Sequence, residues 1–432
     1  MHMATNAEGS PRHSRIFLIL VAAALIYSFL AGLRTITDYD VFWQMATGRW
    51  IAVHHAIPST EVLSYTASGQ PWIYPILSGL LFYIIFLAGG YALLSVLGAA
   101  ACVGTTALLL RRASMATVAL TIVALPRIAA RTGPRAEMFT AILFAAFLSL
   151  LWEYLTTGRA RLWLLPVLMV AWVNLHLGFV AGFALIGAYA ACELLEICFA
   201  GERRKNARQR LARAWPWLAL TLPASLINPW GWNIYGALLR QNQAMAQHAQ
   251  WINEWAAVPL SWNSWSDLVS VRDTKGVFLL MFAVAVVCAV LAVLEKQIGA
   301  ALLIVAALYL GIQHVRLQAL SVCVVIVVGG WILSKALTRW ASRTLDLRMK
   351  QIVLGGAAAL LLILAAARSI DLVTNRHYLG GTDTATFGTG LSWWFPQGAF
   401  AFVEQNALPA EIFHSYNTGG FVSWRLGPKY RD

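Results

Sequence analysis

Charged residues are scarce in this sequence. Asp, Glu, Lys and Arg together make up 12% of its 432 residues, whereas soluble domains average about 25%. Hydrophobic residues make up 59%. A chain of this length would suffice for two or three soluble domains, but it has too few charges to cover their surfaces. The composition therefore excludes a soluble protein and predicts an all-α integral membrane protein.

Cysteine is also scarce, and its spacing matches no metal site. The five cysteines all lie in or at the ends of apolar runs: Cys102, Cys192, Cys198, Cys288 and Cys323. This placement argues against a disulfide framework or a zinc site and favours core packing. A basic stripe with interleaved aromatic residues is missing too. The net charge of +13 therefore does not indicate a nucleic-acid partner.

Long apolar runs recur along the whole chain. A helix needs about 20 apolar residues to cross the hydrocarbon core of a bilayer. The first run follows Arg12, His13 and Arg15 and has no small-residue cleavage site, so we expect a span and not a cleaved signal peptide. We predict about eleven transmembrane helices: 16–33, 91–110, 114–130, 137–155, 162–174, 178–199, 215–227, 276–294, 298–312, 317–334 and 352–368. The short runs 162–174 and 215–227 suit tilted or partly re-entrant helices.

Lys and Arg clusters orient these spans. If residues 73–88 lie along the outer face as a juxtamembrane helix, every cluster falls on one side, which the positive-inside rule assigns to the cytoplasm. The clusters are 111–112, 159–161, 201–213, 296 and 335–350. We therefore predict a multi-pass protein of the bacterial cytoplasmic (inner) membrane, with a cytoplasmic N-terminus and an outer first loop at 34–90.

A second juxtamembrane helix is predicted in the same outer loop, at 41–54. Trp43 and Trp50 would anchor it at the membrane interface. Its apolar side chains share one face, which is typical of a helix that lies on a membrane; they are Phe42, Met45, Ala46, Trp50 and Val53.

The polar C-terminal segment differs in pattern from the rest. It predicts a helix at 396–406, followed by a hairpin in EIFHSYNTGGFVSWRL with its turn at 417–420. We therefore divide the chain into a transmembrane domain, 1–368, and an extracytoplasmic segment, 369–432. We expect this segment to be the incomplete start of a small α/β unit.

Two carboxylates follow the first span directly. Asp38 and Asp40, in TDYDVFW, can hold a divalent cation such as Mg or Mn, or act as a base beside the bilayer. Alternatively, Asp40 caps the helix that follows, although a cap needs only one of the two. Glu61, in IPSTEVLSYTASGQPW, is either another functional acid or a turn residue.

Several basic residues lie at the predicted outer ends of spans. Arg127, Arg131 and Arg135 stand against the positive-inside bias. A guanidinium group suits a phosphate partner, although it can also meet lipid headgroups. His314 and Arg316 fill a very short outer turn, where they could contact a phosphate or pyrophosphate.

Two further polar residues interrupt apolar surroundings near the outer face. His176, in WVNLHLGF, either faces a cavity or is a hydrogen-bonded packing residue. Glu254 lies between Trp251 and Trp255. It either binds the hydroxyls of a sugar that stacks on these rings, or is an exposed loop residue.

The order of these features resembles that of the polytopic glycosyltransferases of the type C fold (GT-C), and most closely uncharacterised bacterial members. The matching stretches run along nearly the whole chain: 38–51, 57–72, 131–140, 172–179, 226–235, 252–255, 313–318 and 413–424. Members of this superfamily use polyprenyl-phosphate sugars. The resemblance implies that Asp40, and with it Asp38, is the catalytic carboxylate, and that Arg131, Arg135, His314 and Arg316 hold the lipid phosphate.

One position departs from the pattern of these relatives. They often carry a second acid at the start of the juxtamembrane helix, where this chain has Tyr74, Pro75 and Ile76. Either Glu61 or Glu254 replaces it, or the protein is a non-catalytic subunit with the same fold. A transporter or lipid flippase is the third hypothesis. The expected partners are a polyprenyl-phosphate-linked sugar, a lipid, glycan or protein acceptor, and membrane lipids.

Overall fold

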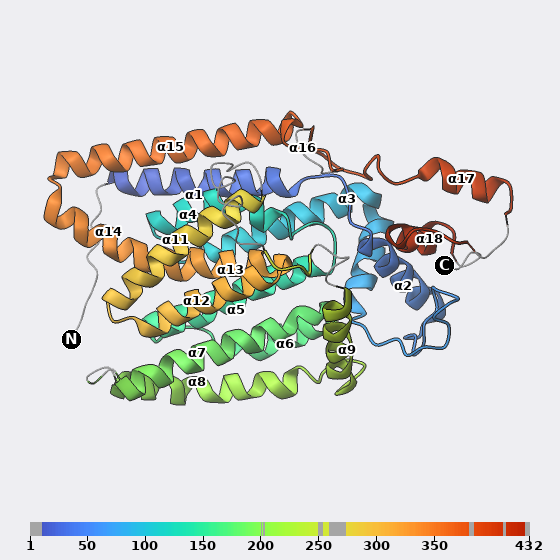
Figure 1. The fold of residues 1–432 in the computed structure, drawn as a ribbon, viewed down its shortest axis with the longest axis horizontal. Helices are drawn as coiled ribbons and strands as arrows, with labels where there is room; N and C mark the ends of the chain where they lie inside the picture. Colours follow the sequence, from blue (N-terminus) through green and yellow to red (C-terminus); the bar gives the residue numbers. More distant parts are fainter. Residues whose placement is uncertain are drawn as a thin grey trace.

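The computed structural model describes residues 11–199, 201, 204–248, 254–258, 274–379, 384–408 and 412–427. Within these residues the protein is built from helices, and the β pairing amounts to three isolated bridges. Figure 1 shows the long helices running side by side, with shorter helices gathered at one end of the molecule. The prediction of an all-α protein is confirmed for this part of the chain.

Seven helical stretches of the described chain are long and apolar enough to cross a membrane. They are α1 (Pro11–Gly32), α3 (Leu77–Leu109), α5 (Glu137–Thr157), α7 (Val180–Phe199) with the turn before it, α11 (Thr274–Leu294), the stretch Val315–Thr344 with α13 (Gln318–Val324) and α14 (Gly330–Thr344), and α15 (Leu347–Val373). Three shorter apolar helices accompany them: α4 (Met115–Ala129), α6 (Leu164–Leu175) and α12 (Ile298–Gln313). These helices support a multi-pass membrane protein.

The seventh predicted span, 215–227, overlaps α8 (Arg204–Ala224). This helix begins inside the basic run 201–213, so the run is helical from Arg204 onward. Each predicted span overlaps a helix, because the runs of apolar residues that fit a bilayer also favour helices. The number of eleven crossings stays a prediction.

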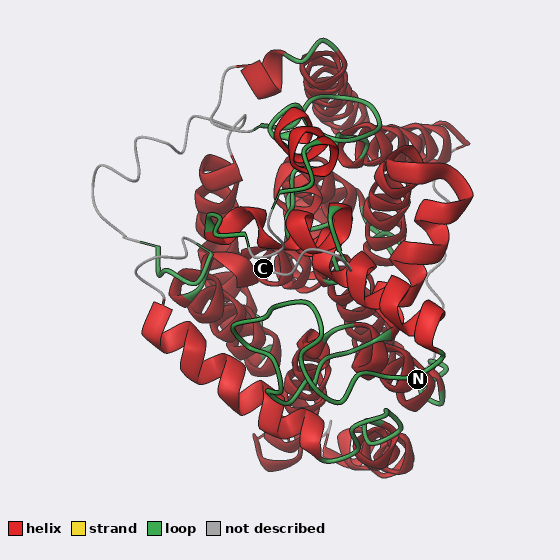
Figure 2. Cartoon of the chain, turned by 90° about the vertical axis from the view of Figure 1, so that its right-hand side faces the viewer, coloured by secondary structure: helices red, strands yellow, loops and turns green. Residues whose placement is uncertain are grey.

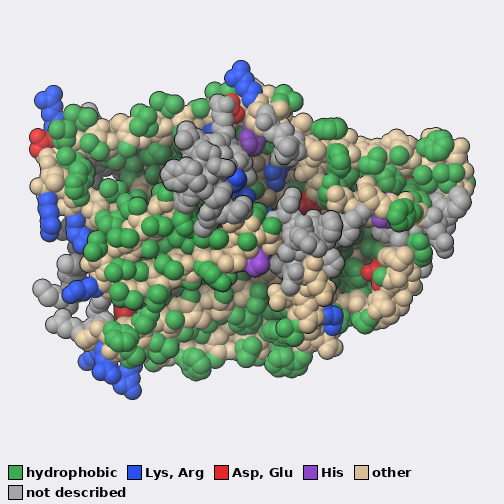
Figure 3. Space-filling view, in the orientation of Figure 1, with side chains coloured by type: hydrophobic (Ala, Val, Ile, Leu, Met, Phe, Trp, Pro, Cys, Tyr) green, Lys and Arg blue, Asp and Glu red, His purple; other side chains and the backbone are tan. Residues whose placement is uncertain are grey.

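The loops between these helices fall into two groups. One cavity brings together Thr156, Arg210, Lys296 and Lys335, from four different helix ends. In the space-filling view, many Lys and Arg side chains lie at the left end, where the basic connections are (Figure 3). The loops before α2 (Asp40–His54) and α5 lie at the other end. Figure 2 looks onto that end, where α9 (Asn233–His248) also lies.

Residues 73–88 and 91–110 belong to one kinked helix. α3 begins at Leu77 and breaks at Gly89 and Gly90, where the backbone leaves helical geometry. Gly90 has φ +60°, a conformation that glycine adopts at little cost. The break allows 77–88 to run in a different direction from 91–109, as two separate predicted helices require. The position of 77–88 relative to a membrane stays a prediction.

The helix predicted at 41–54 is confirmed as α2. The prediction that it buries a single apolar face is wrong. Gln44, Thr47 and Gly48 are buried along with the apolar residues, whereas Val53 is 65% exposed. α2 packs against α3 on one side and α18 (Gly419–Arg425) on the other. Because both neighbours are protein, polar and small residues are buried here as well as apolar ones.

The C-terminal segment packs onto α2 through aromatic side chains. Phe42 of α2 contacts Phe395 and Phe421, each with its ring centroid 4.8 Å away. The predicted helix at 396–406 is confirmed as α17 (Gln397–Gln405). After α15 the chain also forms the short helix α16 (Arg376–Leu379).

The predicted hairpin at 411–426 is wrong. Its expected turn, 417–420, lies in the 3-10 turn Tyr416–Thr418 and the first residues of α18. Phe421 and Trp424 are buried against α2 and α3, so the segment gains more from a helical face than from a strand pair. The division into two domains at 368 and the incomplete α/β unit stay predictions.

Candidate functional site

Seven charged side chains from separate segments meet at the end of the molecule away from the basic loops. Salt bridges of 2.8 to 3.6 Å connect all of them: Asp38, Asp40, Arg131, Arg135, Glu137, Glu254 and Arg316. Six of these were candidates from the sequence, in stretches almost 280 residues apart along the chain. We call this set the charge cluster.

Arg135 is the centre of the charge cluster. Its Nη1 lies 3.1 Å from Asp38 Oδ2 and its Nε lies 3.2 Å from Asp40 Oδ2. The same guanidinium is 3.4 Å from Glu254 and 3.6 Å from Glu137. A guanidinium carries five N–H donors in a rigid fork, so a single arginine can hold four carboxylates from three segments in one place.

Arg131 and Arg316 surround the most enclosed acid, Glu137. Arg131 lies 3.2 Å from Glu137 and 2.8 Å from Glu254, and Arg316 lies 3.6 Å from Glu137. Glu137 occupies the first turn of α5, where the helix dipole also favours a negative charge. A buried carboxylate without such partners would be costly.

The charge cluster has a negative net formal charge. Three guanidinium groups face four carboxylates, which gives a net charge of −1 when all are ionised. A phosphate would bring further negative charge. It can therefore bind to the arginines only if a carboxylate is protonated or moves away.

Asp38 and Asp40 play different local roles. Asp38 Oδ1 accepts a hydrogen bond of 2.9 Å from the backbone N–H of Asp40, the first residue of α2. Asp40 is not the helix cap, because the N-cap residue is Tyr39. Asp40 accepts a bond of 3.2 Å from Trp43 Nε1 and its side chain is 43% exposed. Asp40 is therefore the more exposed acid of this pair.

The surroundings shift the ionisation of several groups in the charge cluster. Burial, with Asp40 and Glu254 nearby, raises the pKa of Asp38 even against the attraction of Arg135. For Glu254, burial opposes ionisation, but Arg135 and Arg131 outweigh it and lower the pKa of the carboxyl. Burial also opposes the charge of Arg135, yet its four carboxylate neighbours raise its pKa. The surroundings thus favour the protonated form of Asp38 and the charged form of Glu254.

His176 is held in a single tautomer behind the charge cluster. Thr140 Oγ1 lies 2.9 Å from Trp172 Nε1, which can only donate, and 2.8 Å from His176 Nδ1. The Gly178 backbone N–H donates to the same ring nitrogen over 3.1 Å. Nδ1 is therefore an acceptor, and the proton of the neutral ring is on Nε2. Burial lowers the pKa of His176 to about 3, so the ring stays neutral.

A largely apolar cavity opens beside these residues. It has a volume of about 670 Å³ and is walled by α5, α7, α9, α12 and α13. Its apolar walls include Leu177, Leu238, Leu239 and Leu320. The polar residues at its border are Arg131, Glu137, His176, His314 and Arg316. We call it the lateral groove; it combines an apolar body with cations at one edge.

A smaller cavity of about 60 Å³ lies on the other side of the charge cluster. Asp38, Arg135 and Glu254 line it, and Arg131 and Glu137 line both this cavity and the lateral groove. The charge cluster therefore separates two spaces, and a molecule in either space can contact Arg131.

Backbone bonds hold Glu254 against the charge cluster. The Arg316 N–H donates to Glu254 O over 2.9 Å, and the Val315 N–H donates to Ala256 O over 3.1 Å. His314 Nδ1 lies 3.2 Å from Trp255 O. The turn at 314–316 thus fixes the segment 254–258, which is why His314 and Arg316 matter for the position of Glu254.

Glu61, a predicted site residue, makes its hydrogen bonds within its own turn. Its Oε1 accepts the backbone N–H of Leu63 at 2.6 Å and of Ser64 at 3.2 Å. The alternative interpretation, a turn residue, fits these contacts. Arg127, also considered from the sequence, is buried and donates to Val315 O over 2.7 Å, which positions the turn that carries Arg316.

Glu137 and the surroundings of Tyr74 were not predicted from the sequence. Glu137 follows Arg135 almost directly at the start of a predicted span, and an ionisable residue at a span boundary is itself a signal. Tyr74 is a partly buried residue just before α3. Its ring lies 4.8 Å from Trp43, and burial, with Asp40 close by, raises its pKa.

The described residues offer little for a metal ion. They contain no group of three His, Cys, Asp or Glu side chains placed to hold one. Asp38 and Asp40, the predicted metal ligands, both contact Arg135, whose positive charge opposes a cation there. A divalent ion at this pair would first have to displace the guanidinium.

The fold and site together define a class: an all-α, multi-pass membrane protein with a charge cluster at one end and a groove beside it. No protein-family model matches the chain, and no curated protein matches its sequence.

Proposed function

We propose that this protein is a membrane glycosyltransferase that transfers a sugar from a polyprenyl-phosphate donor to an acceptor at the extracytoplasmic face. One observation carries the proposal: the apolar lateral groove ends at Arg131 and Arg316, beside the acids of the charge cluster. A polyprenyl phosphate has an apolar chain and an anionic head, and the groove matches both parts.

Each residue then has a chemical role. An acceptor hydroxyl attacks the anomeric carbon of the sugar and loses its proton to Asp40, the exposed carboxylate. The bond from that carbon to the phosphate oxygen breaks, and the polyprenyl phosphate leaves. Arg131 and Arg316 stabilise the charge on the departing phosphate. His176, whose proton is on Nε2, donates this N–H to a substrate oxygen at the edge of the groove.

Glu254 is the acid that replaces the missing second carboxylate in this proposal. It reaches the charge cluster, whereas Glu61 is used in its own turn. Its position also implies that the donor phosphate must take over contacts with Arg131 that Glu254 makes in this structure. Asp38 and Asp40 would hold Mg or Mn only if Arg135 moved away from them.

A non-catalytic subunit is the second candidate. It is favoured by the charge cluster itself, because each arginine in it already contacts protein carboxylates. Such pairing stabilises a fold without any substrate. No specific contact favours a transporter or flippase.

The decisive experiment compares Asp40→Asn with Glu404→Gln in purified protein supplied with a polyprenyl-phosphate sugar. Glu404 is an exposed acid that pairs with Arg425 in the C-terminal segment. We expect Asp40→Asn to lower transfer by at least about a hundredfold, with an unchanged melting profile, and Glu404→Gln to keep wild-type activity. Full activity of Asp40→Asn would remove this residue from the mechanism. Absence of transfer by the wild-type protein with every donor would favour the non-catalytic subunit.

A further inference from the structure

A second large cavity lies at the basic end of the helices. Its volume is about 730 Å³, and its lining comes from α5, α7, α8, α12 and α14. It lies far from the charge cluster, because α5 carries Glu137 at one end and Thr156, which lines this cavity, at the other. A helix rises 1.5 Å per residue, which separates the two by about 28 Å. We call this space the basic-end cavity.

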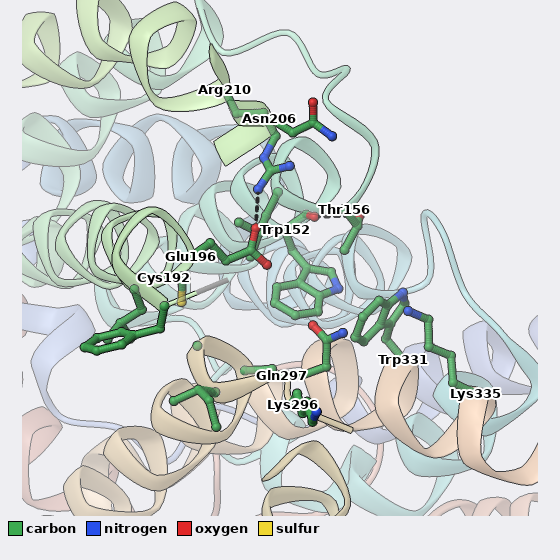
Figure 4. Close-up of a pocket in the computed structure, with 16 residues that line it drawn as sticks. Trp152, Thr156, Cys192, Glu196, Asn206, Arg210, Lys296, Gln297, Trp331 and Lys335 are labelled. Atoms are coloured by element: carbon green, nitrogen blue, oxygen red, sulfur yellow. Dashed lines mark hydrogen bonds and ion pairs between the residues drawn. The ribbon is translucent and has the colours of Figure 1, made fainter. Parts of the chain in front are cut away.

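Charged side chains reach the basic-end cavity from opposite walls. In Figure 4, Arg210 and Glu196 approach from one side, and Trp331 and Lys335 approach from the other. Arg210 lies 2.7 Å from Glu193 and 2.8 Å from Glu196. The positive charge of Arg210 is therefore more than balanced by two carboxylates.

Two lysines add positive charge to the lining of the basic-end cavity. Lys296 and Lys335 both line the basic-end cavity. The Lys335 ammonium lies 3.4 Å from the centroid of the Trp331 ring, a neutral partner that leaves the formal charge in place. Among the described residues that line the cavity, the charged side chains are Arg210, Lys296, Lys335 and Glu196.

The neighbouring cavity adds to this charge. It has a volume of about 430 Å³ and shares Trp152, Trp331 and Lys335 with the basic-end cavity. Arg111 and Arg112 both contact the single carboxylate of Glu153 there, at 3.3 and 2.6 Å. The two spaces together thus present an excess of positive charge, opposite in sign to the charge cluster.

The apolar lining of the basic-end cavity distinguishes a lipid from a free anion. Leu195, Phe199 and Ile298 line it. Phe199 is 82% exposed and Ile298 is 45% exposed, so apolar surface continues outward from the cavity. Trp152 and Trp331 pack edge to face with centroids 5.5 Å apart, and tryptophan is enriched at the level of lipid headgroups. A free phosphate would use none of this surface.

We propose that the basic-end cavity binds the headgroup of an anionic phospholipid from the leaflet on the Lys- and Arg-rich side. Lys296 and Lys335 contact its phosphate, and an acyl chain lies along Phe199 and Ile298. Basic pockets between transmembrane helices bind anionic headgroups by this combination of contacts. The site does not depend on the proposed transferase activity, because the two lie at opposite ends of the helices.

The test measures binding of short-chain phosphatidylglycerol to the detergent-purified full chain by the shift of its melting temperature. Phosphatidylcholine of the same chain length, glycerol phosphate and inorganic phosphate are the comparison ligands. We expect phosphatidylglycerol alone to raise the melting temperature in a saturable way. An equal rise in melting temperature with phosphatidylcholine would show that the site does not recognise the negative charge of the headgroup. An equal rise in melting temperature with glycerol phosphate or inorganic phosphate would overturn the proposal of a lipid site and indicate a site for a free anion.

Variants of the lysines locate the site. The double variant K296Q/K335Q should bind phosphatidylglycerol roughly thirtyfold more weakly, because each lysine contributes about a fivefold factor. Arg343→Gln is the matched control, since Arg343 is an exposed basic residue of α14 outside the cavity. Unchanged affinity in the double variant, or an equal loss in Arg343→Gln, would overturn the site. If the double variant does not fold, the single variants Lys296→Gln and Lys335→Gln each provide the same comparison.

Discussion

The carboxylate of Glu254 lies 2.8 Å from the guanidinium of Arg131. Under the proposed function, that is a position which a donor phosphate would have to share or take over. The Arg316 backbone N–H holds the Glu254 carbonyl at 2.9 Å, so this carboxylate is brought to the charge cluster by the turn after α12. Glu254 therefore competes with any anion for Arg131.

Glu254→Gln tests this competition directly. Loss of one negative charge changes the net charge of the charge cluster from −1 to zero, so a polyprenyl phosphate should bind more tightly. One charge a few ångströms away in a half-exposed site is worth about 1 kcal/mol, which is about a fivefold change in Kd. Titration of the lipid against purified protein measures it. Glu404→Gln is the control, and unchanged or weaker binding by Glu254→Gln would contradict the competition.

Arg135→Gln tests whether one arginine holds the charge cluster together. The substitution leaves Asp38, Asp40 and Glu254 close together without their shared cation. Breaking buried pairs costs about 3–5 kcal/mol, and the partial exposure of these groups reduces the expected loss to about 2–3 kcal/mol. Thermal unfolding in detergent measures the loss.

The control for Arg135 is Arg425→Gln. The Arg425 pair with Glu404 is about 40% exposed on both sides, so its loss should cost less than about 1 kcal/mol. Equal stability losses for the two variants would show that the charge cluster has no special structural role.

Gly48→Ala tests the close contact between α2 and α3. A methyl group on Gly48 would overlap the carbonyl of Gly79, and one on Gly79 would come within 2.6 Å of the Gln44 carbonyl. Overpacking of this kind costs about 1–3 kcal/mol. Gln44 also accepts the Ala136 N–H at 3.2 Å, so a displaced α2 should disturb the position of the neighbouring Arg135.

We therefore expect Gly48→Ala to lower the melting temperature and, under the proposed function, to lower transfer as well. Gly104→Ala on α3 is the matched control, because the space around Gly104 is open. Should Gly104→Ala be as damaging as Gly48→Ala, the close helix contact would not be the cause.

His176→Asn tests the pH dependence of the buried imidazole. Burial lowers the pKa of folded His176 to about 3, whereas a histidine in the unfolded chain has a pKa of about 6.5. Between these values the unfolded state binds the extra proton, so stability falls as pH falls below about 6.5. The expected loss is about 2 kcal/mol at pH 5.

The Asn variant cannot take up this proton and should lose less stability between pH 7.5 and pH 5 than wild type does. Its amide oxygen can still accept the Gly178 N–H, which limits other damage. Melting temperatures at the two pH values measure the difference. His54→Asn, at an exposed position, should keep the wild-type difference. If both variants behave alike, His176 is not the group responsible.

Much of the helix pattern was predictable from the amino-acid sequence, because the thickness of a bilayer sets the length of each apolar run. The predicted starts of α5 at 137 and α12 at 298 agree with the structure. The positions of Lys and Arg also predicted which loops lie at the same end of the molecule, because the charge of a loop can be counted from its own residues. Asp38, Asp40, Arg131 and Arg135 were found on this basis.

What the sequence by itself determined is therefore the membrane class, the helices and the end at which the acids and arginines gather. The tertiary structure decided the partners. It put four carboxylates around Arg135 and turned 417–425 into helix against α2. It also opened the lateral groove between α5, α7, α9, α12 and α13. The physical reason is that the length of an apolar run depends on consecutive residues alone. The partner of a charged side chain depends instead on which helices become neighbours in the fold.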